Sequence, residues 1–587
     1  MRLAYRTVVR KRAELLFYAF IAAYALIALR LTYVQFWKAE RYEIFGNRIR
    51  GRERQLEAQR GVIYDRIGRE LAINVKAASV YANPNRVREA GALATQLASL
   101  LDCDRSLLLS KLSDDDRGFV WLRRCVEERT GAELRKAKIA GIGVLDEYKR
   151  VYPSEGVAAQ VIGFTNIDGE GLEGVERVAD SYLRGADGLL VADVDPNGRV
   201  IPETRRRMVE PRDGRDVVLT IDRYIQHVAE EELRATFEEN KANGASAIVL
   251  DPKTGEVLAL ANMPSFNPNN RAGSGPECWR NRAITDLYEP GSTLKTITAA
   301  AALEEGLITP NQVFANCAGT VTIGRRRVRC SLHAPFNDGH GEVDLTKLLT
   351  YSCNIAASRL GLDIGPERLY KYEKAFGLLS APNLGLAGAT TGWLEKPLSW
   401  PQIKTANVAF GQGISVSAMQ LAYAYAVIAN DGVMMRPTII KEIRNKDGSL
   451  FKEWTPKVVR RVVSESTAEQ ITKALVSCVN EGTGKAAAVE GYTVGGKTGT
   501  AQKARADGRG YSGGGYVGSF IGFVPASNPK LLIIVVVDEP KGSHYGSVVA
   551  APAFRNIAKK ALWYLRTPRD APQIRPGFKV AKKLTSA

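Results

Sequence analysis

Ser292 and Lys295 lie one helical turn apart and have the residue types of a nucleophile and its base. They follow Glu289-Pro290-Gly291, a predicted turn, and the next residues predict a helix that ends near Gly306. Side chains at positions i and i+3 share one face of a helix. Burial and the helix N-terminus both disfavour a charged ammonium there. A neutral Lys295 could therefore take the proton from the serine hydroxyl and make it nucleophilic.

Two further segments could complete such a site. Ser352-Cys353-Asn354 lies at the edge of a predicted helix, where its hydroxyl could pass on a proton and its amide could bind substrate. Lys497-Thr498-Gly499-Thr500 lies on a predicted strand whose side chains alternate between two faces. We expect a bulge or a strong twist to bring its ammonium and two hydroxyls around one anionic group. Gly499 is expected to let a substrate approach the backbone.

Each of these patterns occurs more than once in the chain, so spacing alone does not locate the site. Other copies, all in turn-like contexts, include Ser449…Lys452, Ser265-Phe266-Asn267 and Lys253-Thr254-Gly255. Only Ser292, Ser352 and Lys497 occur in the order of nucleophile helix, relay loop and edge strand. The candidate site is therefore expected where these three meet.

The elements around these segments predict an α+β fold. Ala245–Leu250 and Glu256–Ala261 read as apolar strands joined by a tight turn, and Leu531–Val537 is a strongly β-branched strand. A helix-rich middle lies between them, and Ala551–Tyr564 predicts a closing helix. Strands at both ends with helices between them predict a central antiparallel sheet flanked by helices.

Residues 38 to 240 predict short mixed elements without obvious chemistry. Val217–Ile221 reads as a strand, and Asp222 is the predicted N-cap of a helix that runs toward Asn240. We interpret this region as a structural pedestal.

The N-terminal region predicts a membrane anchor. Residues 1–12 carry five basic side chains, and residues 13–37 are largely apolar, with Glu14 and Arg30 as their only charged side chains. This is enough for a spanning helix of roughly 20 residues if Arg30 snorkels to the interface. The basic flank predicts that the N-terminus lies inside and the rest of the chain outside. A cleaved signal peptide is less favoured, because its candidate cleavage triplet Ala23-Tyr24-Ala25 lies within the apolar run.

Composition argues against several other classes. The 587 residues include 81 Lys and Arg against 63 Asp and Glu, a net charge of +18, but most of these charges are scattered. Outside a bacterial membrane such a surface would meet acidic lipid or wall polymer rather than nucleic acid. Seven cysteines in so long a chain exclude a small disulfide scaffold, and four histidines argue against a histidine-rich metal enzyme.

Cys317, Cys330, His333 and His340 lie close together in the sequence. Their spacing matches no common zinc finger. A disulfide between Cys317 and Cys330 and a metal site both stay open, and we assign no metal ligand and no cofactor to the chain.

The ordered trio of boxes resembles the transpeptidase domain of the penicillin-binding proteins. The similarity extends along nearly the whole chain and is strongest to the monofunctional, class B members. The segments that carry it are Arg60-Gly61…Asp65-Arg66…Gly68, Gly171–Glu176, Leu219–Asp222, Glu289–Ser292 and Ala409–Gly413.

The resemblance implies an α+β fold: an α/β-sandwich transpeptidase domain on an elongated mixed α/β pedestal, with one N-terminal transmembrane helix. The implied domains are a cytoplasmic tail (1–12), the anchor (13–37), a dimerisation-type pedestal (38–240), the transpeptidase domain (241–570) and a basic C-terminal tail (571–587).

The resemblance also implies the roles of single residues. Ser292 would attack the penultimate D-alanine of a peptidoglycan stem peptide, Lys295 would take its proton, and Ser352 would help protonate the leaving D-alanine. Asn354 would hold the donor peptide. The terminal carboxylate would be bound by the third box, namely Lys497, Thr498, Gly499 and Thr500. Backbone N–H groups of Ser292 and Thr500 would form an oxyanion hole.

By the same resemblance, the partners would be D-Ala-D-Ala stem peptides, β-lactams and a SEDS-family glycan polymerase at the inner membrane. The segment Ala406–Pro437 and the absence of long insertions favour a division role over an elongation role. The same boxes are also compatible with a carboxypeptidase or β-lactamase that hydrolyses the acyl-enzyme, and with a non-catalytic β-lactam sensor or scaffold. The absence of a signalling domain before Arg12 argues against a sensor.

Overall fold

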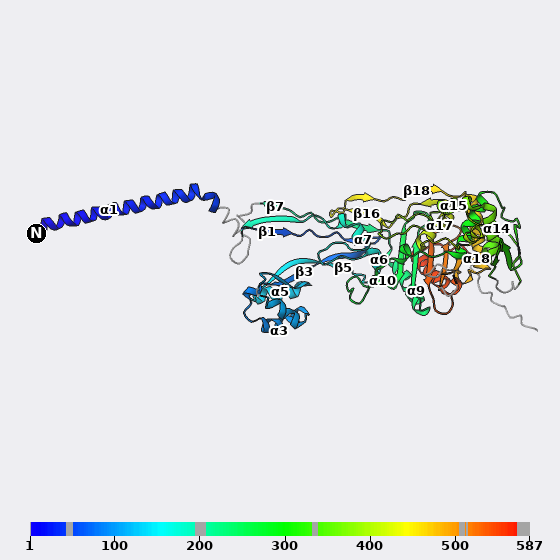
Figure 1. The fold of residues 1–587 in the computed structure, drawn as a ribbon, viewed down its shortest axis with the longest axis horizontal. Coiled ribbons are helices and arrows are strands. Elements are labelled where there is room, and N and C mark those ends of the chain that lie inside the picture. Colours follow the sequence, from blue (N-terminus) through cyan, green and yellow to red (C-terminus); the bar gives the residue numbers. More distant parts are fainter. Residues whose placement is uncertain are drawn as a thin grey trace, which may run out of the picture. The chain divides into compact units, whose positions relative to one another are not determined.

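The computed structural model describes residues 2–42, 51–114, 116–193, 207–331, 338–503, 511 and 515–571 (Figure 1). His333 and residues 572–587 of the predicted basic tail lie outside these residues. The chain forms two compact units. One unit comprises Met1–Gln59 and Gly185–Asp213, and the other comprises Arg60–Arg184 and Gly214–Ala587.

The first unit contains a long N-terminal helix. Helix α1 (Arg2–Thr32) continues into a π-helical turn, η1 (Tyr33–Trp37). Within the described residues, Val8–Trp37 is long and apolar enough to cross a membrane, and its side chains are not buried by the protein. The predicted anchor overlaps this stretch.

The same unit contains a small antiparallel sheet with the strand order β1-β6-β7. Its strands are β1 (Gly51–Leu56), β6 (Gly188–Asp193) and β7 (Arg207–Val209).

A five-stranded antiparallel sheet forms the centre of the second unit, with the order β10-β9-β21-β20-β19. Strands that are far apart in the sequence lie side by side here, as the green and orange segments of Figure 1 show. Its strands are β9 (Gly244–Leu250), β10 (Val257–Met263), β19 (Gly495–Gln502), β20 (Tyr516–Val524) and β21 (Leu531–Asp538). The predicted central antiparallel sheet is confirmed.

Helices cover both faces of this sheet. Side chains alternate along each strand, so each strand contributes to two separate cores. On β9, Ala247 and Val249 pack into one core with Phe554 of the closing helix. Ile248 and Leu250 point the other way, into the core that contains Tyr425. Strand β9 is buried on both faces and therefore reads as an uninterrupted apolar run.

The sequence predicts the helices of this domain as a group, and the structure gives their individual bounds. They are α9 (Arg223–Glu239), α10 (Pro276–Trp279), α11 (Arg282–Thr285), α12 (Lys295–Glu304), α13 (Leu345–Thr350), α14 (Asn354–Ile364), α15 (Pro366–Ala375), α16 (Gln402–Ala409), α17 (Ala418–Ala429), α18 (Glu465–Asn480), α19 (Gly546–Val549) and α20 (Ala551–Tyr564). Asp222 caps α9 as predicted, since its side chain accepts hydrogen bonds from the N–H groups of Tyr224 and Ile225.

A second sheet contains the strands of the pedestal region. Its strand order is β17-β16-β8-β2-β3-β4, and β5 pairs with β3. Its strands are β2 (Ile63–Tyr64), β3 (Glu70–Ala82), β4 (Val120–Glu127), β5 (Ile142–Val151), β8 (Asp216–Leu219), β16 (Ile440–Arg444) and β17 (Leu450–Glu453). Its helices are α3 (Ala90–Leu101), α4 (Arg105–Leu112), α5 (Glu128–Ala137), α6 (Ala159–Ile162), α7 (Gly174–Val178) and α8 (Asp180–Leu183). Strands β16 and β17 come from the C-terminal half of the chain and join this sheet through β8.

A buried ion cluster joins two of the segments that carry the family resemblance. Arg60 Nε donates to Glu176 at 2.7 Å, and its Nη1 donates to Asp180 at 2.6 Å. Arg150 Nε donates to the other oxygen of Glu176 at 2.7 Å. Glu176 is fully buried. An isolated charge there would be very costly, so each of these segments depends on the other.

Candidate active site

The three predicted segments meet at one cleft with a volume of about 760 Å³. Residues of all three boxes line it, namely Ser292, Ser352, Asn354, Thr498 and Thr500. Lys295 and Lys497 are fully buried next to these lining residues. The predicted meeting of nucleophile, relay and edge strand is therefore present in the fold.

Ser292 lies in a 3₁₀ turn, η4 (Gly291–Leu294), and the α-helix begins only at Lys295, later than the sequence predicts. The cause is a tight contact with a neighbouring segment. Gly291 has a φ of +54°, and its N–H donates to the carbonyl oxygen of Gly411 at 3.0 Å. A Cβ at Gly411 would lie 2.0 Å from the carbonyl oxygen of Gly291, so both positions require glycine.

A buried tyrosine fixes the start of α12. The hydroxyl of Tyr425 donates to the carbonyl oxygen of Thr293 at 2.7 Å and also lies 2.7 Å from Oγ1 of Thr296. One turn further on, Oγ1 of Thr298 donates to the carbonyl oxygen of Ala409 at 2.8 Å. These contacts hold the turn that carries Ser292 against the centre of the domain.

Lys295 connects the first box to the second. Its Nζ lies 2.6 Å from the carbonyl oxygen of Ser352, 3.1 Å from Ser352 Oγ and 2.6 Å from Oδ1 of Asn354. Burial, and then the charge of Lys497, lower the pKa of Lys295 to about 7. An amine with such a pKa is partly neutral at physiological pH and can act as a base.

The relay loop is held in an uncommon conformation. Ser352 has a φ of +59°, and Asn354 begins α14. The amide Nδ2 of Asn354 donates to the carbonyl oxygen of Arg329 at 2.9 Å, while its oxygen accepts from Lys295. The amide that we expect to bind substrate is thus already hydrogen bonded within the protein on both sides.

Strand β19 places the third box at the edge of the central sheet. Its pairing with β20 runs without a register shift, so the expected bulge is absent from this strand. Thr498 and Thr500 line the cleft, whereas Lys497 is buried and its Nζ lies 3.5 Å from Thr498 Oγ1. The ammonium group of Lys497 therefore lies near the hydroxyl of Thr498, although the two residues are neighbours on the strand. Burial lowers the pKa of Lys497.

Gly499 packs closely against neighbouring protein atoms. A Cβ at this position would lie 2.3 Å from Ser519 Oγ and 3.0 Å from Cγ2 of Thr293. The space beside Gly499 is therefore filled by the protein itself. Glycine here lets β19 pack closely against the turn that carries Ser292.

Two family models match the chain. The model described as the penicillin binding protein transpeptidase domain matches residues 245–559, which contain the whole cleft, and the penicillin-binding protein dimerisation domain matches residues 55–219. The chain belongs to the class B penicillin-binding proteins, the peptidoglycan D,D-transpeptidases.

Individual relatives cover most of this penicillin-binding protein. It is 34% identical to peptidoglycan D,D-transpeptidase FtsI of Escherichia coli K12, over 89% of this chain and 86% of that protein. It is 35% identical to stage V sporulation protein D of Bacillus subtilis, over 94% of this chain and 86% of that protein. The crystal structure of penicillin binding protein 3 from Mycobacterium tuberculosis complexed with aztreonam is 29% identical, with a TM-score of 0.68, and covers 88% of this chain and 99% of that one.

Sequence reasoning missed the contacts of a glutamate that lies just before the serine turn of this penicillin-binding protein and lines the neighbouring cavity. Glu289 Oε1 accepts hydrogen bonds from the N–H of Gly413 at 2.8 Å and from the hydroxyl of Tyr511 at 2.9 Å. Burial raises the pKa of Glu289. The residue joins three segments that are distant in sequence. Its place directly before Pro290-Gly291 was the only local signal that could have indicated a role.

Aromatic residues on the cleft wall were also missed. Tyr516, His544 and Tyr545 line the cleft, and the rings of Tyr516 and His544 stack with their centroids 4.0 Å apart. They come from β20 and from the loop after β21, and no local pattern distinguishes them in the sequence. Flat apolar surfaces of this kind suit the packing of a peptide or a β-lactam side chain.

The second Ser-x-x-Lys pattern does not form a site. Ser449 Oγ donates to Asp447 at 2.6 Å within a turn. Lys452 is exposed on β17, and its Nζ lies 4.4 Å from the ring centre of Trp454. Neither side chain lines the cleft.

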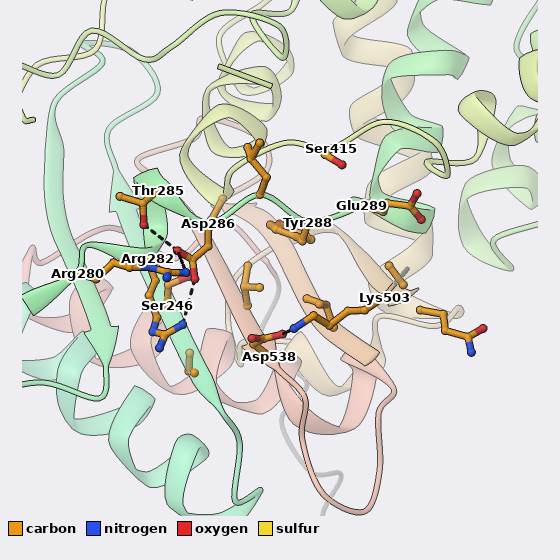
Figure 2. A pocket seen from close by; sticks show the side chains of 18 residues that line it. Ser246, Arg280, Arg282, Thr285, Asp286, Tyr288, Glu289, Ser415, Lys503 and Asp538 are labelled. Atoms are coloured by element: carbon orange, nitrogen blue, oxygen red, sulfur yellow. Dashed lines mark hydrogen bonds and ion pairs between the residues drawn. The ribbon is translucent and has the colours of Figure 1, made fainter. Parts of the chain in front are cut away.

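A second cavity of about 550 Å³ adjoins the cleft and shares Ala501 and Gln502 with it. Figure 2 shows two groups of ion pairs among its lining side chains: Asp286 with Arg280 and Arg282, and Lys503 with Asp538. Because no residue of the three boxes lines this cavity, we place the chemistry in the first cleft.

All seven cysteines are thiols, so the disulfide considered between Cys317 and Cys330 is not formed. The two residues nevertheless lie near each other, beside the relay box.

Proposed function

We propose that this chain crosslinks peptidoglycan stem peptides through an acyl-enzyme on Ser292. The observation that carries this assignment is the contact of Lys295 Nζ with Ser352 Oγ, at 3.1 Å, next to a cleft that Ser292 and Thr500 line. Base and proton relay are thus in contact, and nucleophile and relay line the same cleft, as we expect of a serine acyltransferase.

In the first step, Ser292 Oγ forms a bond to the carbonyl carbon of the penultimate D-alanine. Lys295 takes the hydroxyl proton, and backbone N–H groups of Ser292 and Thr500 stabilise the oxyanion. The C–N bond to the terminal D-alanine then breaks. The proton passes from Lys295 to Ser352 and on to the leaving amine, which departs as free D-alanine.

In the second step, the amine of a neighbouring stem attacks the acyl carbon. A new C–N bond forms, Lys295 takes the proton that the attacking amine loses, the bond to Ser292 Oγ breaks, and Lys295 passes that proton to the serine oxygen. The product is a peptide crosslink. Asn354 holds the donor peptide after its amide gives up the bond to Arg329.

The terminal carboxylate of the donor binds at β19. Thr498 and Thr500 line the cleft, and Lys497 supplies a positive charge beside the hydroxyl of Thr498. Because β19 is an edge strand, an extended stem peptide can also align along it. β-Lactams present a similar anionic group, a carboxylate or a sulfonate, beside a reactive carbonyl and would acylate the same serine; a related protein forms a complex with the β-lactam aztreonam.

We also propose how the enzyme sits in the cell. Residues 1–12 are cytoplasmic, 13–37 span the inner membrane, and the pedestal (38–240) and transpeptidase domain (241–570) are extracytoplasmic. The support is the apolar helix Val8–Trp37, its basic flank and the ranges of the two family matches. The segment Ala406–Pro437 and the likeness to FtsI support a septal role beside a SEDS-family polymerase.

The test is to label the full chain, purified in detergent, with a fluorescent penicillin and to locate the adduct by mass spectrometry. We expect the adduct on Ser292, and Ser292→Ala should slow labelling by at least about 10⁴-fold. Ser449→Ala is the matched control and should label normally. An adduct on Ser449 would overturn the assignment. Incubation with pentapeptide donor and an acceptor stem separates crosslinked product from hydrolysed donor, and hydrolysis alone would favour a carboxypeptidase.

A further inference from the structure

Three cysteines and a histidine gather beside the relay box, and the proposed reaction uses none of them. Their ligand atoms, the sulfurs of Cys317, Cys330 and Cys353 and a ring nitrogen of His340, all lie within 4.8 Å of one another. Cys317 ends the short strand β11 (Ala315–Cys317), and Cys330 directly follows β13 (Arg326–Arg329). His340 precedes β14 (Gly341–Val343).

Three of the distances between these ligand atoms match those of a tetrahedral metal site. Zinc bonds of about 2.3 Å to sulfur and about 2.0 Å to nitrogen put two sulfurs about 3.8 Å apart and a sulfur and a nitrogen about 3.6 Å apart. The sulfurs of Cys330 and Cys353 are 3.7 Å apart. His340 Nδ1 lies 3.6 Å from the sulfur of Cys317 and 3.4 Å from that of Cys330.

The same distances argue against a disulfide. Two bonded sulfurs lie about 2.05 Å apart, well below the separation of Cys330 and Cys353. A disulfide would also use only two of the three thiols. Four converging donors from separate segments are explained by a shared ligand, and a set of three sulfurs and one imidazole matches the preferences of zinc.

Backbone N–H groups support two of the sulfurs. The N–H of Asn354 donates to the sulfur of Cys330 at 3.3 Å, and the N–H of Ala356 donates to that of Cys353 at 3.4 Å. Donors in these positions stabilise thiolates and orient metal ligands. Cys317, Cys353 and His340 are each at most 4% exposed, so the cluster is shielded from solvent on most sides.

We propose that Cys317, Cys330, His340 and Cys353 bind one Zn²⁺ ion in a structural site. The ion fixes the relay box from behind, because Cys353 lies between Ser352 and Asn354. It ties this loop to β11, β13 and β14, which otherwise form only two-stranded pairs. With all four protein ligands in place the site is closed, so the ion does not contact substrate.

The first test is the metal content of the full chain, purified in detergent without chelators. We expect close to one zinc per chain by elemental mass spectrometry. Replacement by Co²⁺ should give intense visible bands of tetrahedral cobalt together with thiolate-to-cobalt charge transfer in the near ultraviolet. This spectrum is recorded on the unmodified sequence and does not depend on the folding of a variant or on transpeptidase activity.

Variants identify the ligands. Cys317→Ser and His340→Ala should each weaken zinc retention against a chelator by at least about tenfold, whereas Cys278→Ser, a cysteine of the same domain outside the cluster, should retain zinc fully. Chelation of the unmodified chain should lower its thermal unfolding midpoint and slow penicillin labelling of Ser292.

Three results would overturn the proposal. One is a chain without zinc that also gives no tetrahedral cobalt spectrum. Another is a disulfide between any two of Cys317, Cys330 and Cys353 in peptide mapping of the purified protein. The third is full zinc retention in Cys317→Ser. Each can occur while Ser292 still reacts with penicillin, so the fate of this proposal is distinguishable from that of the proposed function.

Discussion

Nζ of Lys295 lies 2.6 Å from Oδ1 of Asn354, so the candidate base of the first box is hydrogen bonded to the amide of the second. Because the oxygen of this amide faces the lysine, its nitrogen faces the carbonyl oxygen of Arg329, 2.9 Å away. The contact makes the two boxes one unit. A substitution of either residue should therefore change the position and hydrogen bonding of the other.

We expect the rate of penicillin labelling to rise with pH through the pKa of Lys295, which burial and the charge of Lys497 lower to about 7. Deprotonation makes the lysine a base, so the rate should increase between about pH 6 and pH 8 and then level off. The measurement is labelling under single-turnover conditions. Lys295→Arg, whose side chain stays charged, should label poorly at every pH, and a pH-independent rate in the unmodified chain would contradict the assigned role.

Gly499→Ala should separate β19 from the turn that carries Ser292. The new Cβ would meet Ser519 Oγ at 2.3 Å, and relief of such an overlap typically costs about 1–3 kcal/mol. We expect slower penicillin labelling and a lower unfolding midpoint. Adding Ser519→Gly removes the nearest atom and should restore part of both. If Gly499→Ala had the labelling rate and the unfolding midpoint of the unmodified chain, the close packing at Gly499 would not be needed for reactivity or stability.

Glu176→Gln should destabilise the pedestal, because it leaves Arg60 and Arg150 buried without their shared carboxylate. Breaking a buried ion pair by removing one partner costs about 3–5 kcal/mol. Chemical denaturation of the purified chain measures this loss. The control is Glu133→Gln in the exposed pair with Arg129, where we expect a change below about 0.5 kcal/mol. Equal effects of the two substitutions would contradict the structural role of the cluster.

Glu230 should make stability fall as the pH rises. Its burial in α9 raises its pKa to about 7, although Gln226 and the N–H of Ala158 both donate to Oε1. The folded state thus holds a proton that the unfolded state has released, and this contribution is complete below about pH 4.5 and lost through about pH 7. Glu230→Gln keeps the acceptor oxygen and should remove this slope, with a gain of at most about 3 kcal/mol at pH 8.

The measurement is the free energy of unfolding at several pH values. Glu238→Gln, an exposed substitution on the same helix, should leave the slope unchanged. A slope that persists in Glu230→Gln would assign the effect to other groups.

Local patterns in the sequence were sufficient for the elements with strong periodicity or clear caps. The closing helix has the predicted bounds, Ala551–Tyr564, and Asp222 caps α9 as expected. The β-branched run at Leu531 forms a central strand. In each case the determining interactions lie within the element or in its burial on both faces, so a short window of sequence contains the signal.

Contacts between distant segments could not be predicted in this way. Glu289 meets Tyr511 across more than two hundred residues, and Asn354 meets Arg329 through a backbone carbonyl that any residue type would provide. Cys353 joins a cluster whose other members the sequence grouped without it. Only the fold decides these partners, since neither composition nor spacing distinguishes them.

Lys295 and Lys497 are both fully buried, and burial lowers the pKa of each, so both ammonium groups lose a proton more easily than a lysine in water. A carboxylate that binds in the cleft beside Lys497 brings a negative charge close to the two lysines, and this charge favours their protonated forms. Arrival of the donor peptide is therefore coupled to uptake of hydrogen ions from the medium. Affinity for the anion should weaken in alkaline buffer, even though the hydroxyl that reacts with it becomes easier to activate under the same conditions.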